Sequence, residues 1–162
     1  MPCLHRAAIA IALLCTACGT AAPDPELEVG VGYSAFEAVT PGANVPMCRG
    51  PQGAQMVVLS LRARNLAPGS VKYMLTLQKP GASEPLCGQA RAHAGLVAHD
   101  GWGEICGGAY CILPLPDAVT GTMTQLLGTL EDSAGHKLSA QTTIVPVGPG
   151  PPCDLPLLPC QQ

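Results

Sequence analysis

Hydrophobic and polar residues alternate along most of the chain after its first two dozen residues. The clearest alternation, with a period of two, covers residues 55–66, 71–79, 120–132 and 137–147. Successive side chains of an extended strand point to opposite faces, so this pattern predicts β-strands with one buried and one solvent-facing side. No segment keeps the 3.6-residue apolar period of a helix, so a helical or α/β fold is not expected.

Three more segments alternate less regularly, at residues 28–36, 89–97 and 105–113. Proline and glycine punctuate the chain between all these segments, as in Pro68-Gly69. About seven short strands separated by turns predict an all-β fold, an antiparallel β-sandwich. In strand count and patterning the body resembles an immunoglobulin-like sandwich, although Trp102 falls in a loop by composition.

Composition restricts the classes of protein that fit. The chain has 162 residues, of which 19 are Gly and 17 are Pro, and only 12% are charged, with a formal net charge of −3. This length fits one domain with tails, and so many turn residues argue against a helix bundle. Because the chain is acidic and has no cluster of Lys or Arg, neither nucleic acid nor an anionic membrane surface is an expected partner.

The N-terminus has the features of an export signal. A short, weakly positive start precedes eight apolar residues at positions 7–14. Eight residues are too few to span a bilayer, which takes about 20, but they suit the apolar part of a secretory signal. The run ends in Leu14-Cys15-Thr16-Ala17-Cys18-Gly19.

This ending resembles the lipobox of bacterial lipoproteins. The resemblance implies cleavage between Ala17 and Cys18 and a diacylglyceryl group on the Cys18 thiol, with membrane attachment through that lipid. Thr16 and Ala17 match the small-residue positions, whereas Cys15 stands where the family has an aliphatic residue. The alternative is an ordinary signal peptidase cut after Ala17 or Ala22, which would give a secreted protein.

The chain therefore divides into four parts. Residues 1–17 form the expected signal peptide, 18–26 a flexible tether, 27–147 the sandwich domain and 148–162 a tail rich in proline and cysteine. The expected location is the cell envelope, at the outer membrane or facing the periplasm.

Nine cysteines in so short a chain favour an oxidising compartment and disulfides. Lipid on Cys18 would leave an even set of six in the mature chain. These are Cys48, Cys87, Cys106, Cys111, Cys153 and Cys160. We expect Cys106–Cys111 to close a Gly-rich loop and Cys153–Cys160 to close a loop in the tail, which leaves Cys48–Cys87 by elimination.

A metal site is the alternative for part of this set. His93 and His99 precede Cys106 and Cys111, and two His with two Cys can bind zinc, but the spacing matches no common zinc module. Free thiols at the two cysteines are a further alternative. We expect no metal and no cofactor.

Motifs for catalysis are missing from the sequence: it has no G-x-S-x-G, H-E-x-x-H or phosphate-binding glycine loop. His99 and Asp100, close to Trp102 and Glu104, could line a pocket. Arg62 and Arg64 share a strand face and could bind an anion, although a solvated sheet face explains them too.

The sequence thus predicts a lipid-anchored envelope protein with a binding or structural role and no enzymatic activity, its partner an envelope protein or a glycan. The alternative is an envelope metal-binding protein or enzyme that uses the His93, His99, Cys106 and Cys111 region.

Overall fold

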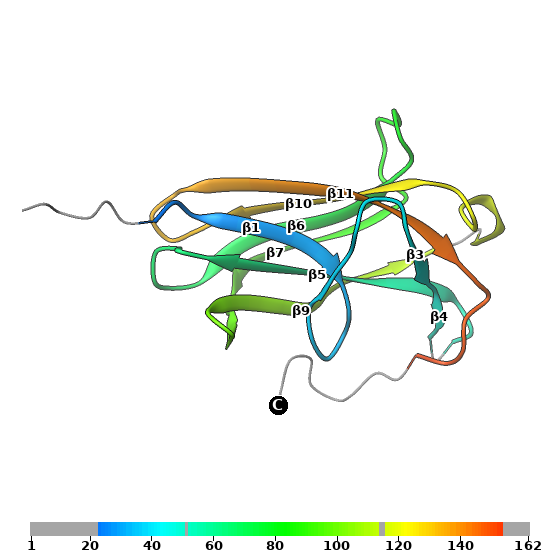
Figure 1. Cartoon of the computed structure of the whole chain (residues 1–162), viewed down its shortest axis with the longest axis horizontal. Helices are drawn as coiled ribbons and strands as arrows, with labels where there is room; N and C mark the ends of the chain where they lie inside the picture. The colour runs from blue at the N-terminus through cyan, green and yellow to red at the C-terminus, as the bar shows by residue number, and fades with distance from the viewer. Residues whose placement is uncertain (1–22, 51, 114–115, 154–162) are drawn as a thin grey trace, which may run out of the picture.

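The chain folds into two β-sheets packed face to face (Figure 1). The computed structural model describes residues 23–50, 52–113 and 116–153. Sheet A consists of β1 (Glu26–Val31), β2 (Glu37–Ala38), β4 (Cys48–Arg49), β5 (Gln55–Arg64), β8 (Val97–His99) and β9 (Trp102–Ile112). Sheet B consists of β3 (Ala43–Pro46), β6 (Val71–Gln78), β7 (Cys87–Ala94), β10 (Thr124–Glu131) and β11 (Lys137–Val147). The predicted all-β antiparallel sandwich is confirmed, with one parallel pair between β3 and β11.

The apolar side chains at alternate positions of the strands form the core between the two sheets. On β5 the side chains of Val57, Leu59 and Leu61 are buried, and on β6 those of Leu75 and Leu77 are buried. They belong to one continuous apolar cluster that both sheets contribute to. The residues between them face outward, as Arg62 and Arg64 do on β5 and Lys72 and Met74 do on β6.

The strand boundaries follow the alternation where it is regular. β11 has the predicted bounds, and β5 and β6 start where predicted. β10 begins only at Thr124, because residues 119–122 form a turn closed by a hydrogen bond from the N–H of Thr122 to the carbonyl of Val119. Trp102 was expected in a loop but is the first residue of β9.

Sheet A is partly covered on its outer face by its own chain. The strand expected at 28–36 ends at Val31, and the next residues turn back over the sheet; Gly32 adopts a φ of 112°, which favours glycine. Phe36 then packs over Gly30, where a Cβ atom would lie 2.8 Å from the Phe36 ring. This covering segment, residues 32–36, is called the sheet A flap below.

β9 contains a bulge opposite β5. Leu59 is opposite Ala109 and Leu61 is opposite Ile105, so three residues of β9, 106–108, face the single residue Ser60. Ser60 Oγ accepts a hydrogen bond from the N–H of Gly107 and donates one to the carbonyl of Gly32. The bulge is thereby tied to the start of the sheet A flap.

The first residues after β11 are also ordered. The N–H of Arg49 donates to the carbonyl of Pro151 at 2.7 Å, and the N–H of Cys153 donates to the carbonyl of Arg49 at 2.8 Å. Residues 151–153 therefore run beside β4 at the edge of sheet A. The expected signal peptide, Cys18 and Cys160 lie outside the described residues.

Candidate functional site

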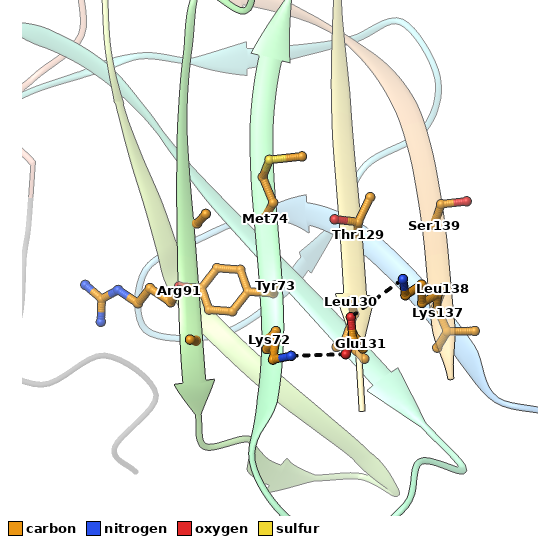
Figure 2. A pocket seen from close by; sticks show the side chains of 12 residues that line it. Lys72, Tyr73, Met74, Arg91, Thr129, Leu130, Glu131, Lys137, Leu138 and Ser139 are labelled. Atoms are coloured by element: carbon orange, nitrogen blue, oxygen red, sulfur yellow. Dashed lines mark hydrogen bonds and ion pairs between the residues drawn. The ribbon is translucent and has the colours of Figure 1, made fainter. Parts of the chain in front are cut away.

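The outer face of sheet B contains a hollow of about 670 Å³, shown in Figure 2. β6, β7, β10 and β11 all contribute to it. Its lining residues are Lys72, Tyr73, Met74, Ala90, Arg91, Ala92, Thr129, Leu130, Glu131, Lys137, Leu138 and Ser139. We call this feature the sheet B hollow.

Short side chains make the sheet B hollow open. Thr129 of β10 lies opposite Met74 of β6 and Ser139 of β11, and these three positions face away from the core. Ala90 faces Met74 from β7. Met74 is 45% exposed, which makes it one of the few large apolar side chains of the described residues that solvent reaches. The hollow therefore combines small or hydroxyl-bearing neighbours with one exposed thioether.

One end of the sheet B hollow is charged. Lys72 Nζ lies 3.1 Å from Glu131 Oε1, and Lys137 Nζ lies 4.0 Å from Glu131 Oε2. Two lysines thus share one carboxylate, which leaves a local positive excess on a chain whose net charge is −3. Arg91 also lines the hollow, but Figure 2 shows its guanidinium on the other side of β7.

The buried carboxylate of Asp132 forms several hydrogen bonds at the same end of the sandwich. The side chain of Asp132 accepts hydrogen bonds from the N–H groups of Ala67, Ala134 and His136, and His136 Nδ1 lies 2.9 Å from it. These contacts, above all the hydrogen bond from Ala67, hold the pKa of Asp132 well below its ordinary value, although burial acts in the opposite direction. Asp132 thereby joins the β10–β11 turn to the segment between β5 and β6.

The residues that line the sheet B hollow include no histidine or cysteine. Its carboxylate is held by two lysines, and the Tyr73 hydroxyl is turned inward, where it donates to the carbonyl of Gly108 at 2.8 Å and where burial raises its pKa.

The outer face of sheet A has a different chemistry. The guanidinium of Arg62 lies 4.6 Å from the ring centre of Phe36 and 4.5 Å from that of Trp102, and it pairs with Glu28 at 2.7 Å. Arg64 lies 4.5 Å from Trp102 and pairs with Glu26 at 2.6 Å. Both arginines therefore contact carboxylates and aromatic rings of the chain itself.

Glu104 lies in the middle of this face. Its side chain is almost entirely buried; the N–H of Phe36 donates to Oε2 at 3.3 Å, and His99 Nδ1 lies 3.2 Å from Oε1. His99 Nε2 lies 3.8 Å from Asp100 Oδ2. The residues expected to line a pocket thus meet as a contact between the β8–β9 hairpin and the sheet A flap.

The fold does not bring together the four residues of the alternative metal site, His93, His99, Cys106 and Cys111. His93 lies on β7 in sheet B, where its Nδ1 is 3.4 Å from Ser70 Oγ, whereas His99 lies on β8 in sheet A. Cys106 and Cys111 are both disulfide-bonded, so neither offers a thiolate. Within the described part of the chain, no three His, Cys, Asp or Glu residues are grouped to hold a metal ion.

The disulfides differ from the expected pairs. Cys48 bonds to Cys153, and Cys87 bonds to Cys111, with Cα–Cα distances of 4.8 and 5.3 Å. Cys106–Cys111 fails because both residues lie on β9, where five residues of rise separate Cα atoms by roughly 16 Å and a disulfide needs about 4–7 Å.

The other two expected pairs fail for reasons of placement. Cys48–Cys87 is wrong because β4 lies on the β1 side of sheet A, whereas β7 is the strand at the opposite edge of sheet B. Cys153–Cys160 is wrong because residues 151–153 run beside β4, which places Cys153 against Cys48. Cys87 and Cys111 instead face each other between the sheets, since their strand partners Leu77 and Val57 both point into the core.

Comparisons with known proteins identify no relative: no family model, no curated protein and no solved structure matches the chain. None of the helices in the described residues is long and apolar enough to cross a membrane.

Proposed function

We propose that this protein is a lipid-anchored, non-catalytic binding module of the bacterial cell envelope. The lipobox-like residues at Ala17 and Cys18 support anchoring through a diacylglyceryl group on Cys18. The disulfides Cys48–Cys153 and Cys87–Cys111 fit an exported protein, because such bonds persist in oxidising compartments.

The sheet B hollow carries the binding part of the proposal. Its open shape, the exposed Met74 and the shared Lys72–Glu131–Lys137 contacts suit another envelope protein that presents an apolar side chain beside an acidic one. Methionine adapts its shape to apolar neighbours, and the positive excess favours a negative partner. We further propose that the sandwich is immunoglobulin-like, an idea supported by its two packed sheets and the inter-sheet disulfide.

The anchoring proposal is tested by comparing the parent chain with a Cys18→Ser variant. The parent should fractionate with membranes and its N-terminal peptide should carry an acyl mass on Cys18. The variant should be released as soluble protein. A parent chain that is soluble, or that begins after Ala22, would refute the anchor.

The binding proposal is tested by photo-crosslinking in intact cells. A photoreactive residue at Thr129 should form a discrete crosslink, whereas one at Gln125 on the same strand and the same face, outside the hollow, should not. Adding Met74→Glu should abolish the Thr129 crosslink while the melting temperature stays unchanged. Equal crosslinking at both positions, or no effect of Met74→Glu, would refute a role for the hollow.

A further inference from the structure

β7 (Cys87–Ala94) forms an open edge of sheet B, next to the sheet B hollow. The strands of this sheet follow the order β3-β11-β10-β6-β7, and within the described residues the only strand that pairs with β7 is β6. Because a strand has hydrogen-bonding groups along both edges, one row of N–H and C=O groups of β7 faces away from the sheet. An open row of this kind can pair with an extended segment of another chain.

The other sheet edges are shorter than β7 or interrupted. β3 has four residues and ends at Pro46, β8 has three residues, and β2 has two. β7 has eight residues with neither proline nor lysine, and its register with β6 is irregular only near its end, where His93 has a φ of 60°. Prolines, lysines and bulges are the usual protection of an edge strand, so the part of β7 before His93 is the least protected edge of the described sandwich.

The outer face of β7 has only small side chains. Ala90 and Ala92 are exposed and line the sheet B hollow. Met74 of β6 lies opposite Ala90, and the irregular register places Lys72 beside Ala92, as Figure 2 shows for the strand of Met74 and Lys72. Because a methyl group rises little above the sheet, a longer side chain from a strand beside β7 can pass over these alanines and reach β6.

We propose that β7 pairs with an added β-strand from another envelope protein, which places an apolar side chain beside Ala90 and an acidic one beside Ala92. This inference rests on the proposed binding role of the sheet B hollow and specifies how its partner is held. Main-chain hydrogen bonds to β7 supply affinity, and contacts with Met74 and Lys72 supply specificity. Since side chains two residues apart share one face of a strand, the recognised segment is extended and has one residue between its apolar and its acidic residue.

Charge favours another protein over a second copy of this chain. Glu131 is shared by Lys72 at 3.1 Å and Lys137 at 4.0 Å, so a further carboxylate at this place would complete a second ion pair. β7 itself contains Arg91 and His93 but no acidic residue. A second copy paired along β7 would therefore bring no carboxylate to Lys72.

Synthetic peptides test the proposal on the exported full-length protein. Two end-blocked threonine peptides serve as probes, one with leucine two positions before glutamate, for parallel addition, and one with the reverse order, for antiparallel addition. One of them should shift the NMR signals of the β7 amides and of the Met74 methyl group, and it should slow hydrogen exchange along β7. Replacing its glutamate by lysine should weaken binding.

A modified peptide separates strand addition from side-chain binding. N-methylation of those peptide residues whose N–H groups would face β7 keeps every side chain but removes main-chain donors. This version should bind about tenfold more weakly or worse, since each lost hydrogen bond costs about that factor.

Two matched variants locate the added strand. Ala90→Tyr fills the outer face of β7 and should prevent the peptide from shifting the Met74 signal. Ala98→Tyr makes the same change on β8, an edge strand of sheet A, and should leave binding unchanged. Melting temperatures show whether both variants remain folded.

The outcomes distinguish this inference from the proposed function. If the N-methylated peptide binds as well as its parent and only the Met74 signal shifts, the hollow binds side chains without an added strand, so the inference fails and the proposed function stands. If no peptide binds, the inference fails, and the Thr129 crosslink in cells decides the proposed function separately. If the β7 signals shift with protein concentration alone, a second copy occupies the edge, which also overturns the inference.

Discussion

The two sheets bury the same kind of residue on their inner faces but differ on their outer faces. On sheet A, the flap folds back so that Phe36 covers Gly30, and the N–H of Phe36 donates a hydrogen bond to Glu104. The guanidinium of Arg62 contacts Glu28 and the rings of Phe36 and Trp102. On sheet B, the corresponding surface around Thr129 consists of short side chains and an exposed Met74.

This difference separates residues that stabilise the fold from residues available to a partner. The most conspicuous groups of sheet A are Arg62, Arg64, Trp102 and the contacts of His99 with Asp100 and Glu104, and all of them are used within the chain. The sheet B hollow has less conspicuous residues, but its apolar side chain is exposed and its charges are unbalanced. A charged or aromatic residue therefore says little about function until its partners are known.

The largest effect should come from the bond that joins the two sheets. The double variant Cys87→Ala/Cys111→Ala removes a disulfide with a sequence separation of 24. The unfolded state then regains the conformational entropy that the crosslink had removed, which should lower the free energy of unfolding by about 3.5 kcal/mol. Denaturant unfolding measures this. Because the bond belongs to neither outer face, the crosslink from position 129 should persist in the double variant at temperatures below its unfolding midpoint. If the folded double variant no longer forms this crosslink, the hollow depends on the disulfide.

A pair of matched leucine variants compares the faces directly. Glu104→Leu leaves the N–H of Phe36 without its acceptor and removes the contact with His99, so it should cost about 2 kcal/mol. Thr129→Leu changes an exposed position on sheet B and should alter stability by no more than about 0.5 kcal/mol. If the two variants have equal unfolding free energies, the proposed contrast between the faces is wrong.

A smaller effect is expected from matched cation replacements. Arg62→Met removes contacts with two rings and one carboxylate and should cost about 1 kcal/mol. Lys72→Met removes one exposed ion pair with Glu131 and should be close to neutral. Thermal unfolding at low and high salt checks this, since the Arg62 effect should largely survive in high salt; a Lys72→Met loss as large as that of Arg62→Met would contradict it.

A pH-dependent effect is expected from Asp132, at the charged end of the hollow. Because folding lowers the pKa of this carboxyl, its contribution is fully present above the unfolded pKa of about 4 and is lost as the pH falls toward the folded pKa. Stability should therefore be flat from pH 7 to 5 and decline below about pH 4. In Asp132→Asn that acid decline should be shallower, as melting temperatures at pH 7 and pH 3 would show; an equal decline would exclude Asp132 as its source.

The sequence predicted the strands well where each one is long and alternates regularly, as β11 does. It missed the short strands β2, β3, β4 and β8, because two to four residues are too few to display a period and their pairing is set by neighbouring strands. Trp102 was expected in a loop because glycines flank it, yet pairing of the next residue, Gly103, with Ala63 extends β9 to include it.

The candidate site was harder to predict, because outer-face chemistry depends on register. Nothing in the sequence places Glu28 and Glu104 on either side of Arg62, although all three are strand residues. The cysteine pairs failed for the same reason: the sequence identified cysteines that form disulfides, but the partners are set by the packing of the two sheets. The sheet B hollow had no motif, since exposed threonine, serine and methionine are common on any strand.

The chain enters the sandwich at Asp24, close to the charged end of the hollow. Asn65 Nδ2 donates to the carbonyl of Asp24 at 2.9 Å, at the end of the sandwich that also contains Lys72, Glu131 and Lys137. With lipid on Cys18 as proposed, the six residues to Asp24 span at most about 20 Å. The hollow would then stay within a few nanometres of the bilayer surface, so its partner would be met by lateral diffusion along the membrane.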